Sequence, residues 1–259
     1  MAAAPYWLKR SRPVAIIMRS LYVRFHRFRS GRYVIQKRKG ILFLFDLLNS
    51  MDKWVIAFGD YEREQRIRLF ETAKLYQRHF SKRVTFVDIG AHWGWYTLMA
   101  HKEEIFSRIV CFEPYAPNMD QLLANVFLNG LSSSIESVQA AVAETSGTRS
   151  FSPPVGTQRA GGKIADPTIG DPSTPVIPVT TVCLDDYFQG DDSIFVIKID
   201  VEGHEHGVIL GAQTLLRNNV CILQIEVFDR NLEQVTSLMN DLGYVLNSRI
   251  GDDCLFQRA

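Results

Sequence analysis

The sequence of 259 residues lacks the cysteine pattern of a metal-binding or disulfide-stabilised protein. Its four cysteines, Cys111, Cys183, Cys221 and Cys254, are far apart, with no CxxC pair and no histidine at metal-ligand spacing. This pattern argues against a zinc site and a disulfide framework, so we expect a reducing, cytoplasmic setting. Long apolar runs are also missing near the N-terminus. The longest there, residues 14–18, is too short for a signal-peptide core or a membrane-spanning helix, which needs about 20 apolar residues.

Acidic residues are absent before Asp46. Residues 1–39 hold 11 of the 29 Lys and Arg, so the remainder carries 18 basic and 28 acidic residues, a net charge of −10. A core of that sign is a poor general binder of polyanions, and we therefore expect no nucleic-acid partner. The basic arm, residues 1–39, is suited instead to peripheral contact with an anionic membrane surface.

The basic arm also has a helical pattern. Apolar residues recur there at helical spacing with arginines mainly on the other side, which predicts a basic amphipathic helix. The apolar positions are Val14, Ile17, Met18, Leu21, Phe25 and Phe28. Three interpretations remain open: a helix packed on the catalytic domain, a membrane-surface helix, or a cleavable organelle presequence. We expect residues 1–59 to be a basic, partly helical extension and residues 60–259 to be the main domain, with the apolar run 41–45 buried against it.

Short apolar runs alternate with helical patterns through the main domain. The runs predict strands at 84–88, 108–113, 135–140, 194–200 and 220–227, and helices at 61–77, 96–102, 117–129 and 204–217. Apolar strands separated by helices indicate a parallel sheet covered on both faces. A last helix at 232–242 and strands at 244–247 and 253–257 suit a closing antiparallel hairpin. The expected fold is a doubly wound, Rossmann-like α/β domain with a mostly parallel seven-stranded sheet and an antiparallel C-terminal strand.

The regular alternation is interrupted after the third strand. Residues 141–151 predict a β-hairpin around Thr145, Ser146 and Gly147. Residues 152–178 are rich in Pro, Gly, Ser and Thr, and a loop of that length in a compact domain is usually a lid or a binding loop. We expect substrate contacts there.

The most informative turn follows the first strand of the alternation. Asp88 ends that strand, and Gly90 and Gly94 lead into the next helix, where the absence of a Cβ lets the backbone approach a ligand. Ligands of open α/β sheets bind at the carboxyl ends of the strands. The glycine spacing is GxxxG rather than GxGxxG, and the carboxylate of Asp88 would repel a pyrophosphate, which disfavours a nicotinamide dehydrogenase.

A cationic ligand fits this turn better. S-adenosylmethionine carries a sulfonium and an ammonium, which Asp88 would favour electrostatically. Glu113 ends the second strand of the alternation, where an acid can accept hydrogen bonds from a ribose diol. Together, Asp88 and Glu113 indicate S-adenosylmethionine as the cofactor. The structural alternative is that Gly90 and Gly94 only permit packing and that Asp88 only caps the helix.

A second group of polar residues follows the strand 194–200. Asp200, Glu202, His204, Glu205 and His206 lie within seven positions at the carboxyl end of this strand. So many titratable groups in one turn favour a functional role for at least one of them.

The sequence Lys-Ile-Asp-Val-Glu-Gly-His-Glu at 198–205 resembles the signature of the FkbM family of methyltransferases. Further segments carry the resemblance over residues 60–247, in the family's order: 87–91, 112–114, 128–130, 140–142, 179–181 with 184–186, and 224–226. The resemblance implies a class I methyltransferase fold and O-methylation of hydroxyls on sugars, glycolipids or related natural products. His92 stands where the family usually has asparagine.

The resemblance places Asp88, Gly90 and Glu113 at the cofactor and Asp200 beside the reacting sulfonium. The full set expected to bind the cofactor comprises Asp88, Gly90, Ala91, His92, Gly94, Glu113, Ala141 and Asp200, and the catalytic candidates are Asp200, Glu202, His204 and Glu205. A small-molecule or glycan acceptor follows from this assignment.

Methyl transfer to oxygen is an in-line displacement, in which alignment alone is worth up to about 7 to 11 kcal/mol. An alcohol also needs a base, and His204, Glu202 and Glu205 are candidates, with His204 favoured because an imidazole titrates near neutrality. The structural alternative for His204 and Glu205 is helix capping and complementarity to the helix dipole. Asp200 and Glu202 would alternatively suit a divalent cation, although we predict no metal site.

Two other functions compete. A nucleic-acid methyltransferase is disfavoured because no Asn-Pro-Pro-Tyr or Asp-Pro-Pro-Tyr motif occurs and the main domain is acidic. A non-catalytic module that docks partners through the basic arm would be favoured by a degraded cofactor motif, whereas the motif here departs only at His92.

Overall fold

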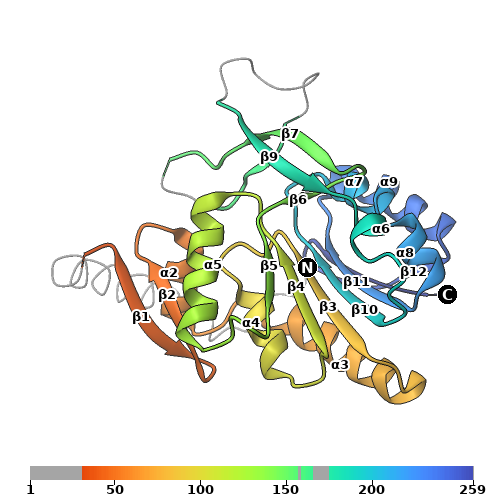
Figure 1. Cartoon of the computed structure of the whole chain (residues 1–259), viewed down its shortest axis with the longest axis horizontal. Coiled ribbons are helices and arrows are strands. Elements are labelled where there is room, and N and C mark those ends of the chain that lie inside the picture. The colour runs from red at the N-terminus through yellow and green to blue at the C-terminus, as the bar shows by residue number, and fades with distance from the viewer. Residues whose placement is uncertain (1–30, 157–158, 166–174, 259) are drawn as a thin grey trace.

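The computed structural model describes residues 31–156, 159–165 and 175–258. Its centre is a seven-stranded sheet in the order β12-β13-β11-β10-β3-β4-β5 (Figure 1). The parallel strands are β3 (Val84–Ile89), β4 (Arg108–Phe112), β5 (Glu136–Val138), β10 (Ile194–Ile199) and β11 (Cys221–Glu226). β12 (Tyr244–Ile250) and β13 (Asp253–Arg258) form an antiparallel hairpin, and β13 runs antiparallel to β11. The predicted class I methyltransferase fold is confirmed.

Helices cover both faces of this sheet. α3 (Arg63–Phe80), α4 (Trp95–Lys102) and α5 (Ala116–Leu128) share one hydrophobic cluster with one face. α6 (Leu184–Tyr187), α7 (Glu205–Leu210), α8 (Gln213–Asn218) and α9 (Asp229–Asp241) lie on the other. Every residue of β3 and β10 is buried, which explains why these strands are mostly apolar on both faces rather than alternating. No helix in the described part of the chain is long and apolar enough to cross a membrane.

The single helix predicted over 204–217 is wrong, because the chain forms two short helices, α7 and α8. They are separated at Gly211, where an added Cβ would lie 2.2 Å from the carbonyl oxygen of Ala143. A side chain cannot be placed at that distance, so the glycine allows the turn between the helices to pack directly against Ala143 and Glu144, the two residues that follow the strand β6 (Ala141–Val142).

The predicted hairpin at 141–151 is also wrong. β6 and β7 (Gly147–Ser152) do not pair with each other; each pairs with β9 (Ile177–Val182), which lies between them. β8 (Lys163–Ile164) completes this four-stranded sheet. β6 is two residues long, too short to hold β7 by itself, whereas β9 forms a longer ladder with β7. Parts of the loop predicted at 152–178, residues 157–158 and 166–174, lie outside the described residues.

The described part of the N-terminal extension packs on the main domain. β1 (Tyr33–Arg38) and β2 (Ile41–Asp46) form an antiparallel hairpin, and α2 (Ser50–Phe58) follows. The inward side chains of Ile41, Phe43 and Phe45 are buried in one cluster with the tryptophans of the first turn, which confirms the predicted burial for these three residues, whereas Leu42 and Leu44 alternate with them and face outward. The amphipathic helix predicted from residues 14–28 lies outside the described residues, and the boundary at residue 59 stays a prediction.

Amide side chains of α5 bind the free edge of β2. Asn125 Oδ1 accepts a hydrogen bond from Leu44 N (2.7 Å), and Asn129 Oδ1 accepts one from Leu42 N (3.0 Å). Asn129 Nδ2 donates to Leu42 O and Gln121 Nε2 donates to Leu44 O, both at 2.8 Å. The three amides recur every four residues and so share one helix face. The hairpin is thereby fixed to the helix that follows β4.

Candidate active site

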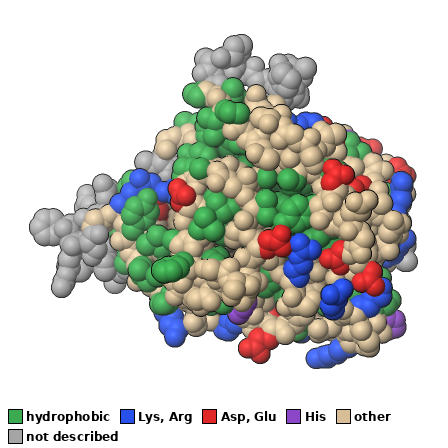
Figure 2. Space-filling view, viewed as in Figure 1, with side chains coloured by type: hydrophobic (Ala, Val, Ile, Leu, Met, Phe, Trp, Pro, Cys, Tyr) green, Lys and Arg blue, Asp and Glu red, His purple; other side chains and the backbone are tan. Residues whose placement is uncertain are grey.

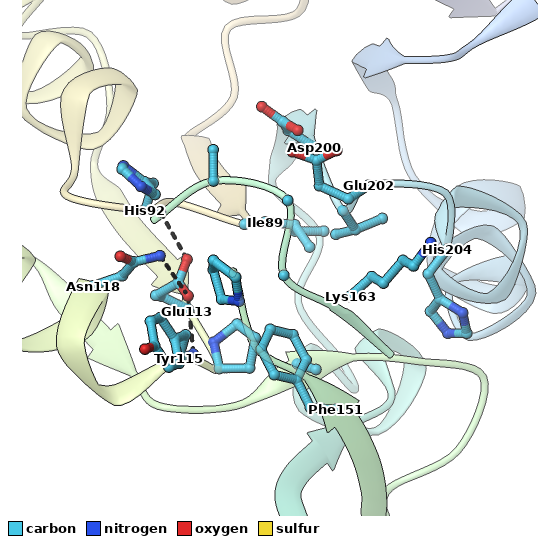
Figure 3. A pocket seen from close by; sticks show the side chains of 18 of the residues that line it. Ile89, His92, Glu113, Tyr115, Asn118, Phe151, Lys163, Asp200, Glu202 and His204 are labelled. Carbon is cyan, nitrogen blue, oxygen red and sulfur yellow. Dashed lines mark hydrogen bonds between the residues drawn. The ribbon is translucent and has the colours of Figure 1, made fainter. Parts of the chain in front are cut away.

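A cavity lies at the carboxyl ends of the parallel strands (Figure 3). Figure 3 shows two groups of side chains around it. Glu113, Tyr115, Asn118 and Phe151 stand at one end, here called the β4 end, and Asp200, Glu202, His204 and Lys163 at the other, the β10 end. A smaller adjoining cavity is lined by Asp88, Ala91, Lys198 and Tyr96, among others, and shares His92, Gly90 and Asp200 with the first.

The two glycines predicted at the cofactor have different places. Gly90 lines both cavities with φ 79°, and a Cβ on it would lie 1.8 Å from the carbonyl oxygen of Asp200. The turn after β3 and the end of β10 therefore touch through their backbones. Gly94 lines neither cavity. It is the residue before α4, with a left-handed φ of 87°, and a Cβ there would lie 3.2 Å from the side chain of Leu122. Gly94 therefore serves the turn and its packing rather than the cavity wall.

Asp88 is buried beneath the turn, with 3% of its surface exposed. Its Oδ2 accepts a 2.6 Å hydrogen bond from the hydroxyl of Thr97 in α4. Burial raises the pKa of Asp88 to about 6, although the bond to Thr97 and the charge of Lys198 oppose this. Thr97 lies in the first turn of α4, and its backbone N–H also interacts with this carboxylate, so Asp88 has the helix-capping role of the alternative interpretation as well.

Glu113 follows β4 and is held by main-chain amides at the β4 end. Its Oε2 accepts from His92 N and its Oε1 from Tyr115 N, both at 2.9 Å, and Asn118 Nδ2 lies 3.4 Å from Oε1. Burial raises the pKa of this carboxyl to about 7, against the effect of these donors. The donors fix the orientation of both oxygens, which still have lone pairs for a ligand.

His92 links the two cavities. Its backbone is left-handed, with φ 53°, and its amide is the donor to Glu113. Both ring nitrogens are buried and have no hydrogen-bond partner among the described residues. Burial lowers the pKa of the imidazole to about 4, so the ring is neutral at pH 7. The ring therefore offers a donor and an acceptor to a ligand, where the family usually has an amide. Ala141 also lines the larger cavity.

A row of polar side chains crosses the otherwise apolar sheet beneath the site. Asp88, Lys198 and Gln224 are register neighbours on β3, β10 and β11. Lys198 is 3% exposed; its Nζ lies 3.1 Å from Asp200 Oδ2 and 5.1 Å from the centre of the Tyr96 ring. The charges of Asp200 and other carboxylates raise the pKa of Lys198 well above its usual value, despite burial. The sequence predicted no role for Lys198, although a lysine inside an apolar strand was the available signal.

Asp200 and Glu226 form a carboxyl pair at the ends of β10 and β11. A hydrogen bond joins their side chains. The positive charge of Lys198 lowers the pKa of Asp200, although burial acts in the other direction. Burial and the negative charge of Asp200 raise the pKa of Glu226 to about 10. At pH 7 Asp200 is therefore the anion, and Glu226 carries the proton that binds it.

The other catalytic candidates are spread over the turn after β10. Glu202 lines the cavity in a left-handed conformation, and burial raises its pKa. His204 also lines the cavity, but its Nε2 lies 3.5 Å from Glu144 Oε2, and burial lowers its pKa. Glu205 is 1% exposed, lines neither cavity, and accepts a 2.7 Å hydrogen bond from Gly203 N. Because its carboxylate fixes its own turn, we no longer place Glu205 among the candidates for the base.

Two further parts of the wall come from outside the strand ends: the N-terminal region, and the loop 152–178 in which the sequence predicted substrate contacts. Met51 and Tyr61 reach the cavity from the N-terminal extension and from the segment before α3. Arg159 brings residues 159–164, here called the strap, over the β4 end, where its carbonyl accepts from Asn118 Nδ2 (3.0 Å). Its guanidinium lies 3.2 Å from Asp46 Oδ2, a fully buried carboxylate. Arg159 is the only charged residue of 152–162, which was the one signal available.

The carboxylates of the site are not arranged as a metal centre. In the described ranges, no three His, Cys, Asp or Glu side chains are placed to hold a metal ion. Asp200, one of the two residues of the magnesium alternative, is engaged by Lys198 and Glu226.

Comparison with protein families agrees with this geometry. The methyltransferase FkbM domain matches residues 88–246, a range that contains Asp88, Glu113, Asp200 and Glu226. The chain belongs to the FkbM methyltransferase family. The predicted resemblance is confirmed. A sequence comparison with curated proteins finds no match.

Solved structures similar to this FkbM-family chain are distant in sequence. A methyltransferase FkbM from Methylobacillus flagellatus has 19% identity over 68% of this chain, with a TM-score of 0.48. The chain spans 43% of the length of that structure. An SAM-dependent methyltransferase from Agrobacterium tumefaciens has 10% identity over 87% of this chain and 69% of its own, with a TM-score of 0.48. The METTL16 methyltransferase domain has 12% identity over 93% of this chain and 78% of its own, with a TM-score of 0.49.

Proposed function

We propose that this chain is an S-adenosylmethionine-dependent methyltransferase that acts on a hydroxyl oxygen of a sugar, a glycolipid or a related small molecule. The observation that carries the proposal is Glu113. Its buried carboxylate faces the cavity at the end of β4, with both oxygens oriented by the amides of His92 and Tyr115. A carboxylate in this position is suited to accept hydrogen bonds from the vicinal hydroxyls of a ribose.

The remaining side chains at the β4 end suit the rest of the cofactor. Tyr115 and Phe151 lie nearly parallel, with ring centres 6.3 Å apart and an interplanar angle of 24°, and both line the cavity. With Ala141 they provide an apolar wall for a purine. The unpartnered nitrogens of His92 and the anionic Asp200 suit the polar, cationic part of the ligand. When bound, S-adenosylmethionine supplies an electrophilic methyl group on its sulfonium.

The residues at the β10 end would orient and deprotonate the acceptor. Glu202 lines the cavity, and its carboxylate interacts with the backbone N–H of Gly161 in the strap. Burial raises its pKa above the ordinary value of 4.5, and a more basic carboxylate is better suited to take a proton from an alcohol. His204 is directed to Glu144 and would support the acceptor side rather than take the proton itself. Asp200 is paired with Lys198 and would keep a negative charge beside the sulfonium of the bound cofactor.

The charge of the cavity favours an uncharged acceptor over a nucleic acid. Asp200, Glu202 and Glu113 face the cavity, and beyond residue 39 the chain has a net charge of −10. A phosphate backbone would meet repulsion there. A non-catalytic cofactor-fold module remains the alternative from another class, and the binding experiment separates the two.

The first test is calorimetric titration with S-adenosylmethionine and with its demethylated product. We expect micromolar binding by the wild type, loss of binding by Glu113→Ala, and unchanged binding by Glu71→Ala, a matched control on the outer face of α3. Absence of binding by folded wild-type protein would overturn the proposal and favour the non-catalytic module.

The second test identifies the acceptor class. S-adenosylmethionine with an isotopic label in the methyl group is offered with hydroxylated sugars, with glycolipids and with RNA. Label recovered as a base-stable ether on a sugar or a glycolipid supports the proposal. Label found only in RNA would replace it with nucleic-acid methylation.

A further inference from the structure

An exposed apolar surface lies on the N-terminal hairpin and the neighbouring helix. Cross-strand pairing places Tyr33, Ile35, Leu42 and Leu44 on the outward face of the hairpin, opposite the buried face. Leu123 and Phe127, one turn apart on α5, are 46% and 76% exposed. We name these six residues the hairpin–α5 surface. Figure 2 shows hydrophobic side chains gathered over β1, β2 and α5 on one face of the molecule.

The charges on the hairpin side of this surface are basic, whereas α5 contributes one exposed acid, Asp120, one turn before Leu123. Lys37 pairs in register with Leu42 on the outward face of the hairpin, and the guanidinium of Arg32 lies 5.2 Å from the centre of the Tyr33 ring. The only acid on that face of the hairpin is Asp46, which is fully buried and paired with Arg32 and Arg159. The hairpin therefore presents aliphatic, aromatic and cationic groups together.

The chain that precedes this surface has the same charge. Residues 1–30 contain seven Lys and Arg and no Asp or Glu. They precede Gly31, the first described residue, which lies two positions before Tyr33 in the sequence. The basic segment is therefore joined by the chain directly to the hairpin that carries the apolar side chains.

We propose that the hairpin–α5 surface and the basic arm dock together on an anionic lipid bilayer. Apolar side chains that enter the headgroup region and cations that meet anionic lipids are the two components of peripheral membrane binding. If residues 1–30 covered the surface instead, their seven cations would lie against Lys37 and Arg32. A second copy of the chain would also bring like charges together. An anionic bilayer is the one occupant that complements both components.

The test is cosedimentation of the full chain with vesicles of phosphatidylcholine alone and of phosphatidylcholine containing phosphatidylserine. We expect partitioning onto the anionic vesicles that weakens as salt is raised. Leu123→Glu with Phe127→Glu should reduce the partition coefficient at least about tenfold, since two apolar contacts are replaced by like charges. The matched control is Val245→Glu with Leu246→Glu, an exposed apolar pair on β12 at the opposite edge of the sheet, which should behave as the wild type.

Three results would overturn the proposal. The first is equal partitioning of the α5 variant and the wild type, and the second is no partitioning of the wild type. The third is that light scattering shows the wild type as a dimer and the α5 variant as a monomer while neither binds vesicles; this would assign the surface to a second copy. Circular dichroism and thermal unfolding of each variant establish that both are folded. The test requires no methyl transfer, so its result is independent of the proposed function.

Discussion

Glu113 should make folding stability and cofactor affinity respond to pH in opposite directions. Burial raises the pKa of its carboxyl from the ordinary value of 4.5 to about 7. Between these values the folded protein takes up a proton that the unfolded chain releases. The free energy of unfolding therefore falls as pH rises from about 4.5 to 7. One pKa unit corresponds to about 1.4 kcal/mol, so the loss attributable to Glu113 is on the order of 3 kcal/mol.

Cofactor binding has the opposite dependence, because a ribose hydroxyl donates its hydrogen bond to the ionised carboxylate. At pH 6, one unit below the pKa of Glu113, about nine-tenths of the empty sites are protonated, and the affinity for S-adenosylmethionine should be roughly tenfold below its plateau. The affinity should reach that plateau near pH 8.

The variant Glu113→Gln separates these effects. Glutamine keeps one acceptor oxygen but turns an NH₂ towards a backbone N–H, so affinity should fall by about 1.5 to 3 kcal/mol, roughly ten- to a hundredfold. In this variant, calorimetric titrations from pH 5.5 to 8.5 should no longer show the rise in affinity that the ionisation of Glu113 causes in the wild type. Its free energy of unfolding, measured thermally, should also depend less steeply on pH. Glu71→Gln is the control. A flat affinity profile for the wild type, or the same profile in Glu113→Gln, would refute the assignment.

Three further predictions concern the walls of the cavity. Arg159→Ala leaves the buried Asp46 with Arg32 as its cationic partner, so the free energy of unfolding, measured thermally, should fall by an amount near the lower end of about 3 to 5 kcal/mol. Stopped-flow should also show faster cofactor release. An unchanged release rate would mean that the strap does not hold the cofactor. Glu202→Gln should lower kcat at least about a hundredfold while cofactor affinity holds, whereas Glu205→Gln should retain kcat; equal losses in both would refute the choice of base. Gly90→Ala, at φ 79° and with its Cβ 1.8 Å from a carbonyl oxygen, should cost about 2 to 5 kcal/mol in denaturant unfolding, and a neutral result would contradict the close approach.

The sheet could be predicted because its strands carry local signals. β3 and β10 are buried on both faces and are therefore mostly apolar, and each is followed by a glycine or an acid that marks the turn. The hairpin predicted around Ser146 failed because β9, beyond a long loop, supplies the partner of β7, and no local pattern shows such pairing. The break at Gly211 depends on contact with Ala143, which is equally non-local.

The candidate site divides in the same way. Asp88, Glu113 and Asp200 could be predicted because each ends a parallel strand, and those ends meet at one edge of the sheet. The residues that hold these carboxylates and shift their pKa values could not be predicted, because Lys198 acts across the sheet and Arg159 reaches the site from the strap. Glu205 lines neither cavity, because sequence proximity to a strand end does not determine whether a side chain turns towards the cavity or back to its own turn.

The amide row on α5 has a consequence for how the protein avoids association. An edge strand with free N–H and C=O groups can recruit a strand from another chain and begin aggregation. Asn125, Asn129 and Gln121 occupy that edge of β2 as a neighbouring strand would, with both donors and acceptors supplied by a helix. The hairpin can therefore keep an apolar outer face without offering the hydrogen-bonding edge of β2 beside it. Replacing these amides with alanine should increase aggregation during refolding, and it would do so without altering a single residue that lines the cavity.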